Sequence, residues 1–217
     1  ERTGDGWFRP VDGVDVAGPL PMPRGERVEI NTALSDSLCG DELGLQWKFW
    51  EPSPWTRDTS ALSRLTCTAE GLTIRAEGSS TVDSRPLLCI PLDRAYEVSV
   101  EVSVQPDTTA GLILFYNDKT GRGPALDGDA AHRGFVWRDG GRSAKTEWPG
   151  PITRLRLVND LHEVTSYVDC GAGWQRFQAG MEVSGLHHNT FDGFVSLRCG
   201  FVVCGSGSAT FRDFEYR

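Results

Sequence analysis

The stretch YEVSVEVSV, residues 96–104, decides the fold class, because apolar and polar side chains alternate along its whole length. A period of two is the spacing at which side chains point to opposite faces of a β-strand. Such a strand buries one face and leaves the other in water, as antiparallel sheets commonly do. We therefore predict a strand over 96–104, with Tyr96 and the valines on the buried face.

The segments that follow this strand in the sequence also have patterns that predict strands. Residues 110–116, AGLILFY, are apolar at every position, as expected of a central strand in a sandwich. Residues 153–158 alternate again, Asn159-Asp160 supplies turn-forming residues, and 162–168 return to alternation. This order predicts a β-hairpin.

The end of the chain predicts one more strand, over 209–216. Phe211 is out of phase with Phe214 and Tyr216, which indicates a β-bulge near Arg212-Asp213. Residues 116–131 are rich in Gly and Asp and are predicted to form a loop. No segment has a helical period of useful length, so the sequence predicts an all-β sandwich.

Composition and charge exclude several classes of protein. The chain has 217 residues, a formal net charge of −8 and scattered arginines, so it lacks the basic patch of a nucleic-acid binder. The same net negative charge disfavours binding to an anionic membrane surface. No apolar run is long enough for a membrane span, and the first residues carry no signal-peptide core, so the sequence leaves localisation open.

Residues 1–32 differ from the remainder of the chain. Pro10, Pro19, Pro21 and Pro23 fall close together, and proline fixes φ and removes a backbone donor. We expect an extended linker or strap over 1–32 that leaves a preceding domain, followed by one β-sandwich over 33–217.

Six cysteines leave the redox compartment undecided. None forms a C-x-x-C pair, so the spacing of a zinc site is absent. Cys199 and Cys204 are near enough in sequence to bridge across a turn. The alternative is that the cysteines are buried free thiols that pack as small apolar side chains.

The candidate catalytic residues are not spaced or directed as the corresponding chemistry requires. Glu97 and Glu101 share the polar face of one strand but are separated by about 13 Å at ~3.3 Å per residue, too far for a glycosidase pair. The adjacent His187 and His188 would point to opposite sides of extended backbone, which suits a shared metal ion poorly. We therefore assign no catalytic residue.

The residue types suggest two further candidate binding sites, with less support than the patterns above. Asp36 and Asp213 would lie close together if the two ends of the sandwich pair, and their carboxylates with backbone carbonyls could hold a structural calcium ion. Trp50, Trp55 and Trp137 lie near predicted loops or strand ends, where an exposed indole could stack on a sugar ring. No other cofactor is expected.

Several motifs in a fixed order resemble one known domain. They are DGWFRP at 5–10, LSD at 34–36 with LGLQW at 43–47, AGLILFYN at 110–117, GMEVSGLHHNTFDGFVSLR at 180–198 and GSGSATFRDFEY at 205–216. Together they resemble the C-terminal sandwich domain of glycoside hydrolase family 43 enzymes, the β-xylosidases and α-L-arabinofuranosidases. The resemblance implies a concanavalin A-like jelly roll of two antiparallel sheets.

The resemblance also implies a function shared with a second domain. In that family a five-bladed propeller carries the catalytic carboxylates. Residues 5–10 resemble the end of that propeller, and none of its catalytic carboxylates can be assigned to this sequence. A sandwich loop helps close the propeller's pocket, and residues 185–192 resemble that loop. Phe191 would then be the aromatic closer, and His187 or His188 would line the mouth.

Three functions follow, in order of preference. The first is an accessory sandwich that packs on a catalytic propeller, in the same or a separate chain, and completes a pocket for xylan- or arabinan-derived oligosaccharides. The second is an independent carbohydrate-binding module. The third is a free-standing concanavalin A-like hydrolase, which the spacing of Glu97 and Glu101 disfavours.

Overall fold

The computed structural model describes residue 25 and residues 33–51, 59–81, 83–138, 141–142, 145–193 and 195–217, with the backbone alone for 135–138 and 141–142. The chain divides into two units between Thr32 and Ala33, and the second unit, Ala33–Arg217, holds every element described below. The predicted linker over 1–32 lies outside the described residues, apart from Gly25.

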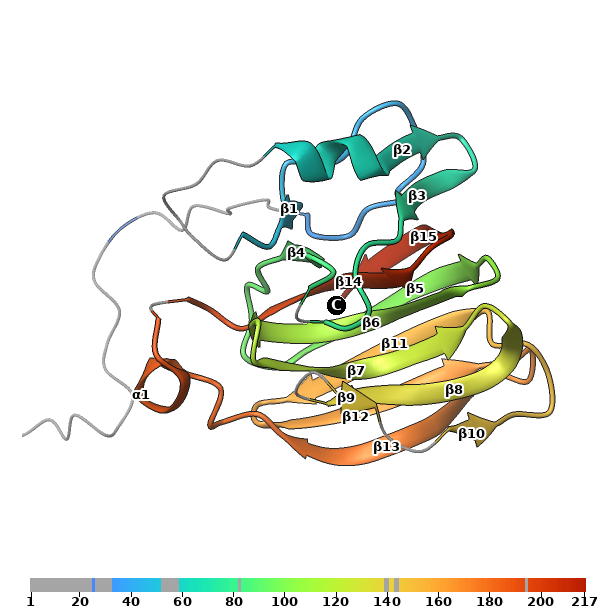
Figure 1. Cartoon of the computed structure of the whole chain (residues 1–217). Coiled ribbons are helices and arrows are strands. Elements are labelled where there is room, and N and C mark those ends of the chain that lie inside the picture. Colours follow the sequence, from blue (N-terminus) through green and yellow to red (C-terminus); the bar gives the residue numbers. More distant parts are fainter. Residues whose placement is uncertain are drawn as a thin grey trace, which may run out of the picture. The chain divides into compact units, whose positions relative to one another are not determined.

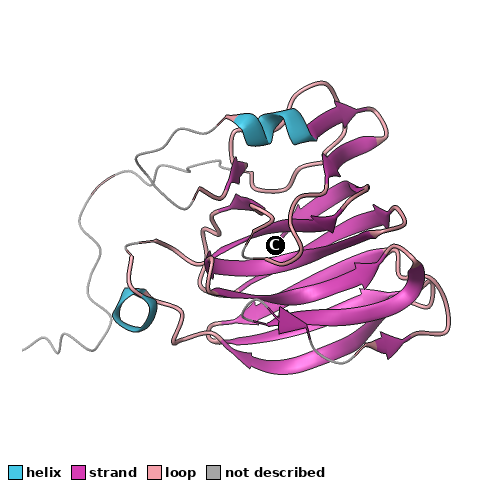
Figure 2. Ribbon diagram, in the orientation of Figure 1, coloured by secondary structure: helices cyan, strands magenta, loops and turns pink. Residues whose placement is uncertain are grey.

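Two antiparallel sheets form the second unit and lie face to face (Figures 1 and 2). The eight-stranded sheet runs β1 (Lys48–Phe49), β4 (Leu87–Cys89), β14 (Arg198–Gly205), β6 (Thr108–Asn117), β7 (Thr120–Asp127), β8 (Ala130–Arg138) and β10 (Thr146–Glu147), and β9 (Gly141–Arg142) also pairs with β8. The seven-stranded sheet runs β13 (Trp174–Glu182), β12 (Glu163–Asp169), β11 (Arg154–Asp160), β5 (Tyr96–Val104), β15 (Ser208–Tyr216), β3 (Gly71–Arg75) and β2 (Leu65–Thr68).

The chain passes repeatedly from one sheet to the other, as a jelly roll does. Among the described strands it crosses at β1 to β2, β3 to β4, β4 to β5, β5 to β6, β10 to β11, β13 to β14 and β14 to β15. Two helical turns complete the described elements, a 3-10 turn at Ser60–Arg64 and α1 at His188–Phe191. No helix in the described residues is long and apolar enough to cross a membrane. The predicted all-β, two-sheet antiparallel sandwich is confirmed.

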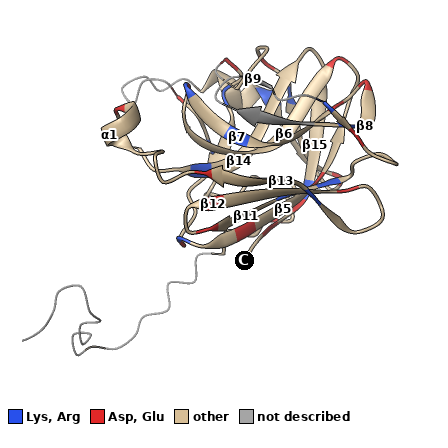
Figure 3. Cartoon of the chain, turned by 90° about the horizontal axis from the view of Figure 1, so that it is seen from below, with Lys and Arg blue, Asp and Glu red and all other residues tan. Residues whose placement is uncertain are grey.

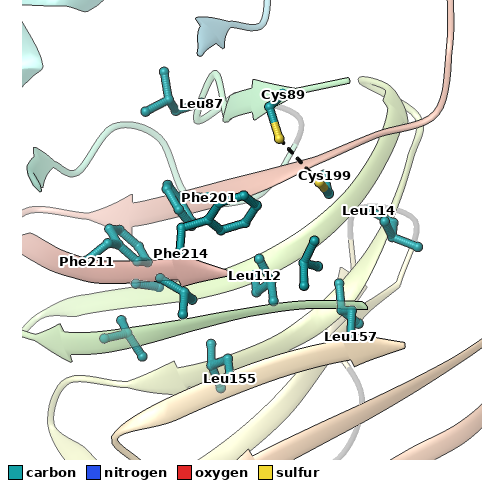
Figure 4. Packing of buried hydrophobic residues seen from close by; sticks show 14 of the residues in the cluster. Leu87, Cys89, Leu112, Leu114, Leu155, Leu157, Cys199, Phe201, Phe211 and Phe214 are labelled. Atoms are coloured by element: carbon teal, nitrogen blue, oxygen red, sulfur yellow. Dashed lines mark hydrogen bonds between the residues drawn. The ribbon is translucent and has the colours of Figure 1, made fainter. Parts of the chain in front are cut away.

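An aromatic cluster fills the space between the sheets (Figure 4). The Phe201 ring stacks on Phe211 with centroids 4.3 Å apart and on Trp47 at 4.9 Å. Phe214 meets the Trp47 ring edge-on at 4.9 Å. Burying one phenylalanine side chain contributes about 1.5–3 kcal/mol, so the apolar positions of β14 and β15 hold the two layers together.

The strongest sequence patterns are confirmed as strands. Residues 96–104 form β5, and 110–116 lie within β6, where every one of those residues is buried. The bulge in the last strand is also present, because the pairing of β15 with β5 shifts between Arg212 and Glu215 and Asp213 has φ 49°. The bulge allows Phe211 and Phe214 both to face the core.

Two expectations about connections are wrong. The β11–β12 hairpin turns at Leu161-His162, not at Asn159-Asp160, because Asp160 pairs with Glu163 and Leu161 takes φ 60°. Residues 116–131 are not a loop, since they supply β7 and the start of β8. Their glycines serve close packing: a Cβ on Gly123 would lie 2.0 Å from the carbonyl oxygen of Leu112.

The cysteines are free thiols, and the bridge between Cys199 and Cys204 is wrong. Both lie on β14, five residues apart, and alternation places them on opposite faces of the sheet, in separate core clusters. The neighbour of Cys199 is Cys89 on β4, with the two sulfur atoms 3.4 Å apart (Figure 4). This contact with Cys89, and burial, raise the pKa of the Cys199 thiol.

The start of the sandwich is joined to its last strand. Asp36 and Phe214 exchange two backbone hydrogen bonds, each 2.8 Å long. The Asp213 N–H donates to the Ser37 carbonyl at 2.9 Å. The two ends of the 33–217 unit therefore pair.

Candidate functional site

The turn that the sequence singles out projects from the connection between β13 and β14 (Figure 1). His187 is the N-cap of α1, and its Nδ1 accepts from the Asn189 N–H at 3.2 Å. A side-chain acceptor at this position satisfies a backbone N–H that the helix leaves unpaired. His187 therefore has a defined structural role, and a proton on its imidazole belongs on Nε2.

The exit of the turn is fixed to the central strand β6. The Tyr116 hydroxyl lies 3.1 Å from the Asp192 carbonyl oxygen and 2.9 Å from that of Gly193. The Asn117 side-chain amide donates to the Phe191 carbonyl at 3.3 Å. Because Tyr116 is fully buried, these bonds position the end of the turn from a rigid part of the fold.

A pocket of about 540 Å³ lies beside this turn. The end of β1, the end of β6, the turn and the start of β14 each contribute to its wall. Its lining residues are Lys48, Phe49, Trp50, Glu51, Asn117, Asp118, Lys119, Phe191, Asp192, Gly193, Val195 and Arg198. Volumes of ~300–1,000 Å³ are typical of small-molecule sites, so the pocket is large enough for a monosaccharide.

Arg198 is a partly buried charged residue in this wall. Its guanidinium carbon lies 4.7 Å from the centroid of the Trp50 ring, and one terminal nitrogen donates to the Tyr116 carbonyl at 3.1 Å. The Nε atom is buried and has no hydrogen-bond partner among the described residues. Burial lowers the pKa of Arg198.

The predicted pocket residues are only partly brought together. Phe191 is half-buried, lines the pocket and lies 6.3 Å from the Tyr116 ring. His187 and His188 are exposed and are not among the lining residues. Their ring centroids are 6.2 Å apart, and their role at the mouth of a pocket stays a prediction.

The three tryptophans proposed for sugar stacking have different positions. Trp50 lines the pocket but is only 8% exposed, since Arg198 lies over its ring and Phe115 meets it edge-on at 5.3 Å. A sugar ring on this indole would therefore have to displace Arg198. Trp55 lies outside the described residues, and for Trp137 only the backbone, in β8, is described.

Asp36 and Asp213 are neighbours, as the pairing of the two ends requires. The Asp36 carboxylate accepts the Leu38 N–H at 2.8 Å and the Trp47 indole N–H at 2.9 Å. These donors suit an anion and would compete with a cation. No group of three or more His, Cys, Asp or Glu side chains is placed to hold a metal within the described ranges. Calcium at this position stays a prediction.

Glu97 and Glu101 are each held by an arginine on the open face of the seven-stranded sheet. Arg156 pairs with Glu97, and Arg212 lies 3.7 Å from Glu101. Arg156 also lies over the Tyr167 ring at 5.3 Å. Positions of both charge signs are interspersed along the strands (Figure 3), and these carboxylates belong to ion pairs.

Sequence reasoning missed Arg198 and the residues around Asn117. The one available signal was a charged residue at the start of RCGFVVC, an otherwise apolar strand. Asn117 and Lys119 were hidden because 116–131 looked like a loop.

Comparison with solved structures identifies the fold. The chain aligns with the GH43 protein BlXynB from Bacillus licheniformis, with a TM-score of 0.70 and 19% identity, over 100% of this chain and 45% of that one. It aligns with xylan β-1,4-xylosidase from Bacillus halodurans C-125, with a TM-score of 0.72 and 18% identity, over 100% and 45%. This chain shares its fold with a domain of GH43 glycoside hydrolases.

A third GH43 structure agrees. The Bacteroides ovatus protein described as xyloglucan PUL GH43B gives a TM-score of 0.72 and 15% identity, over 89% of this chain and 40% of that one. The chain thus spans less than half the length of these three GH43 chains. No family model matches the sequence, and no significant match was found among curated proteins.

Proposed function

We propose that this chain is the accessory β-sandwich of a family 43-type glycoside hydrolase. In this role it packs on a catalytic five-bladed propeller and contributes the Phe191 turn to a pocket for xylo- or arabino-configured sugars. Catalysis takes place on the propeller. The fold shared with part of longer GH43 chains supports this proposal.

One observation supports the proposed role of the turn. Phe191 stands beside a pocket, on a turn whose carbonyls are bonded to Tyr116 and Asn117 of the central strand β6. An aromatic side chain placed in this way has a defined position without being buried in the core. Such pre-organisation is what a residue needs to close a site formed with a second domain.

The test is reconstitution with a family 43 propeller, encoded upstream in the same reading frame or supplied as a separate chain. The double variant Phe191→Ala, His187→Ala should lower kcat/KM on aryl-xylosides or aryl-arabinosides by tenfold or more. Thr190→Ala is the matched control, because Thr190 is exposed on the same turn and does not line the pocket. Unchanged kcat/KM in the double variant would refute the role of the turn.

A second candidate function is independent carbohydrate binding. The pocket supports it, since aromatic side chains such as Phe49 and Phe191 and polar side chains such as Asn117 line the same space, as in many small-molecule sites. Titration calorimetry of the isolated chain with xylan and arabinan fragments tests it. Absence of heat at millimolar ligand would reject it.

A further inference from the structure

Arg198 is partly buried, and its charge is satisfied differently from that of Arg64, a buried arginine. Arg64 is buried, lies 2.8 Å from Glu77, and donates to the backbone carbonyls of Arg75 and Ser84 at 2.9 Å each. Among the described residues, Arg198 has one hydrogen-bond acceptor, the Tyr116 carbonyl. Within the described part of the chain, no carboxylate lies within ion-pair distance of Arg198 and its Nε has no partner.

A desolvated guanidinium without a counter-charge gains from an incoming anion. Removing a charge from water costs free energy unless an opposite charge or hydrogen bonds replace the water. Arginine is also the side chain whose planar group best matches a carboxylate. Since Nε is enclosed, an incoming carboxylate would meet the terminal nitrogens of Arg198 at the pocket wall.

The remaining lining residues restrict the kind of anion. Three cationic and three acidic side chains line the pocket, and Lys48 lies 3.8 Å from Glu51. The pocket therefore has no excess positive charge to attract a phosphate or a polyanion from a distance. A singly charged ligand held by local contact with Arg198 fits this balance better.

The apolar part of the wall indicates what carries the carboxylate. Phe49, Phe191 and Val195 line the same pocket, and Phe191 is half-buried. The C–H face of a pyranose packs on aromatic and aliphatic side chains, while its hydroxyls need polar groups such as Asn117 and Lys119. A volume of about 540 Å³ accommodates one such ring.

We propose that this pocket binds a sugar acid, a pyranose whose carboxylate pairs with Arg198 and whose ring packs against Phe191. The choice of a sugar ring rests on the proposed function. The inference that the ligand carries a carboxylate rests on the surroundings of Arg198 alone. The ligand would be a uronic acid unit, free or at the end of an oligosaccharide.

The deciding experiment compares two ligands on the unchanged full chain. Methyl β-D-glucuronide and methyl β-D-glucoside share a ring and differ at the carboxylate. By calorimetry or NMR titration we expect millimolar binding of the glucuronide and at least tenfold weaker binding of the glucoside. Equal affinities, or no binding of either at 20-fold above ~1 mM, would overturn the proposal.

Variants then locate the site. Arg198→Ala should abolish glucuronide binding, and Arg198→Lys should weaken it about tenfold, since a lysine cannot form the planar contact. Arg212→Ala is the matched control, because Arg212 lies on the other sheet and outside the pocket. If Arg198→Ala does not fold, Lys119→Ala, an exposed change at the same pocket, should still weaken binding. Glucuronide binding unaffected by Arg198→Lys and Lys119→Ala would refute the site.

Partner binding is the competing outcome. One outcome is that the glucuronide does not bind and Arg198→Lys weakens association with the propeller. The group that pairs with Arg198 is then an acidic side chain of the propeller. In that case the sugar-acid proposal is wrong and the accessory role stands. If the glucuronide binds and the propeller does not associate, the accessory role fails and the sugar-acid site stands.

Discussion

The indole nitrogen of Trp47 donates to the Asp36 carboxylate at 2.9 Å, so the first paired residue of the sandwich also orients a core tryptophan. The same carboxylate accepts from Gln46 at 3.2 Å and from the Leu38 N–H. Asp36→Ala would leave a largely buried indole N–H without its acceptor. An unsatisfied buried donor costs about 1–3 kcal/mol, and we expect a loss of that size in urea unfolding.

Asp41→Ala is the control for this prediction. Asp41 is an exposed acid in the same loop, and its removal should change the free energy of unfolding by less than ~0.5 kcal/mol. Equal losses in the two variants would mean that net charge, not the bond to Trp47, matters at this position.

Tyr116→Phe should loosen the Phe191 turn without harming the core. The change removes the hydroxyl that bonds the Asp192 and Gly193 carbonyls and retains the buried ring. We expect a loss of about 1 kcal/mol and faster amide hydrogen exchange confined to 187–193. Leu114→Val, a buried change on the same strand, should destabilise without this local exchange.

Gly200→Ala should be among the most disruptive single-methyl changes in the fold. A Cβ on Gly200 would lie 2.0 Å from the Leu87 carbonyl oxygen and 2.8 Å from the Leu88 Cα, which are backbone atoms of the paired strand β4. The two strands would have to separate, at a cost of ~3 kcal/mol or more. Gly185→Ala, where the added Cβ meets nothing within 4 Å, should be close to neutral in thermal melting.

Thiol titration should show three classes of cysteine. Cys39 is exposed and should react first with an aromatic disulfide reagent. The half-buried Cys67 and Cys170 should react more slowly than Cys39. For Cys67, burial and the nearby Asp36 and Asp41 also raise the pKa. The buried Cys89, Cys199 and Cys204 should react only on unfolding. A Cys39→Ser variant should lose the fast phase alone, and a fast phase that persists would contradict this order.

Acid should remove part of the stability through Asp127. Burial raises the pKa of this carboxyl, but a hydrogen bond from Lys145 at 2.9 Å, the Asp129 N–H and nearby Arg133 outweigh burial and lower it. Because the folded pKa lies below the unfolded value of about 3.9, the contribution is present above that value and is lost as pH falls through the folded pKa.

The Asp127→Asn variant checks this sign. It should be less stable than the original chain at pH 7 by about 1 kcal/mol, a value reduced because Lys145 is 47% exposed. The difference should narrow as pH falls below 4. Asp160→Asn, an exposed change, should show no such narrowing. A difference that is constant with pH would refute the role of the ionised carboxyl.

Strands with a regular pattern were predictable from sequence because local periodicity and final burial agree in them. β5 and β6 coincide with the predicted strands, and the phase change after Phe211 revealed the bulge at Arg212-Asp213. In β5 the apolar side chains at every second position face the core, and in β6 the continuous apolar run corresponds to a strand that is buried at each of those positions.

Other features could not be predicted, because distant parts of the chain determine them. β7 reads as a loop, yet β6 and β8 pair with it on both sides and Gly123 allows the close approach to β6. The contact between Cys89 and Cys199 joins residues that are 110 apart. The pocket around Arg198 likewise combines residues from β1, β6 and β14, and no local pattern brings these together.

The position of β15 within the seven-stranded sheet determines when this sheet can be completed during translation. β15 lies between β5 and β3, although it is the last strand of this sheet in chain order among the described residues. Until residues 208–216 have left the ribosome, β2 and β3 are separated from the remainder of their sheet, and the core lacks Phe211 and Phe214. The nascent chain therefore presents two unpaired strand edges beside exposed apolar surface, the condition in which β-proteins aggregate. Translation that stalls before this strand would leave a product dependent on chaperones.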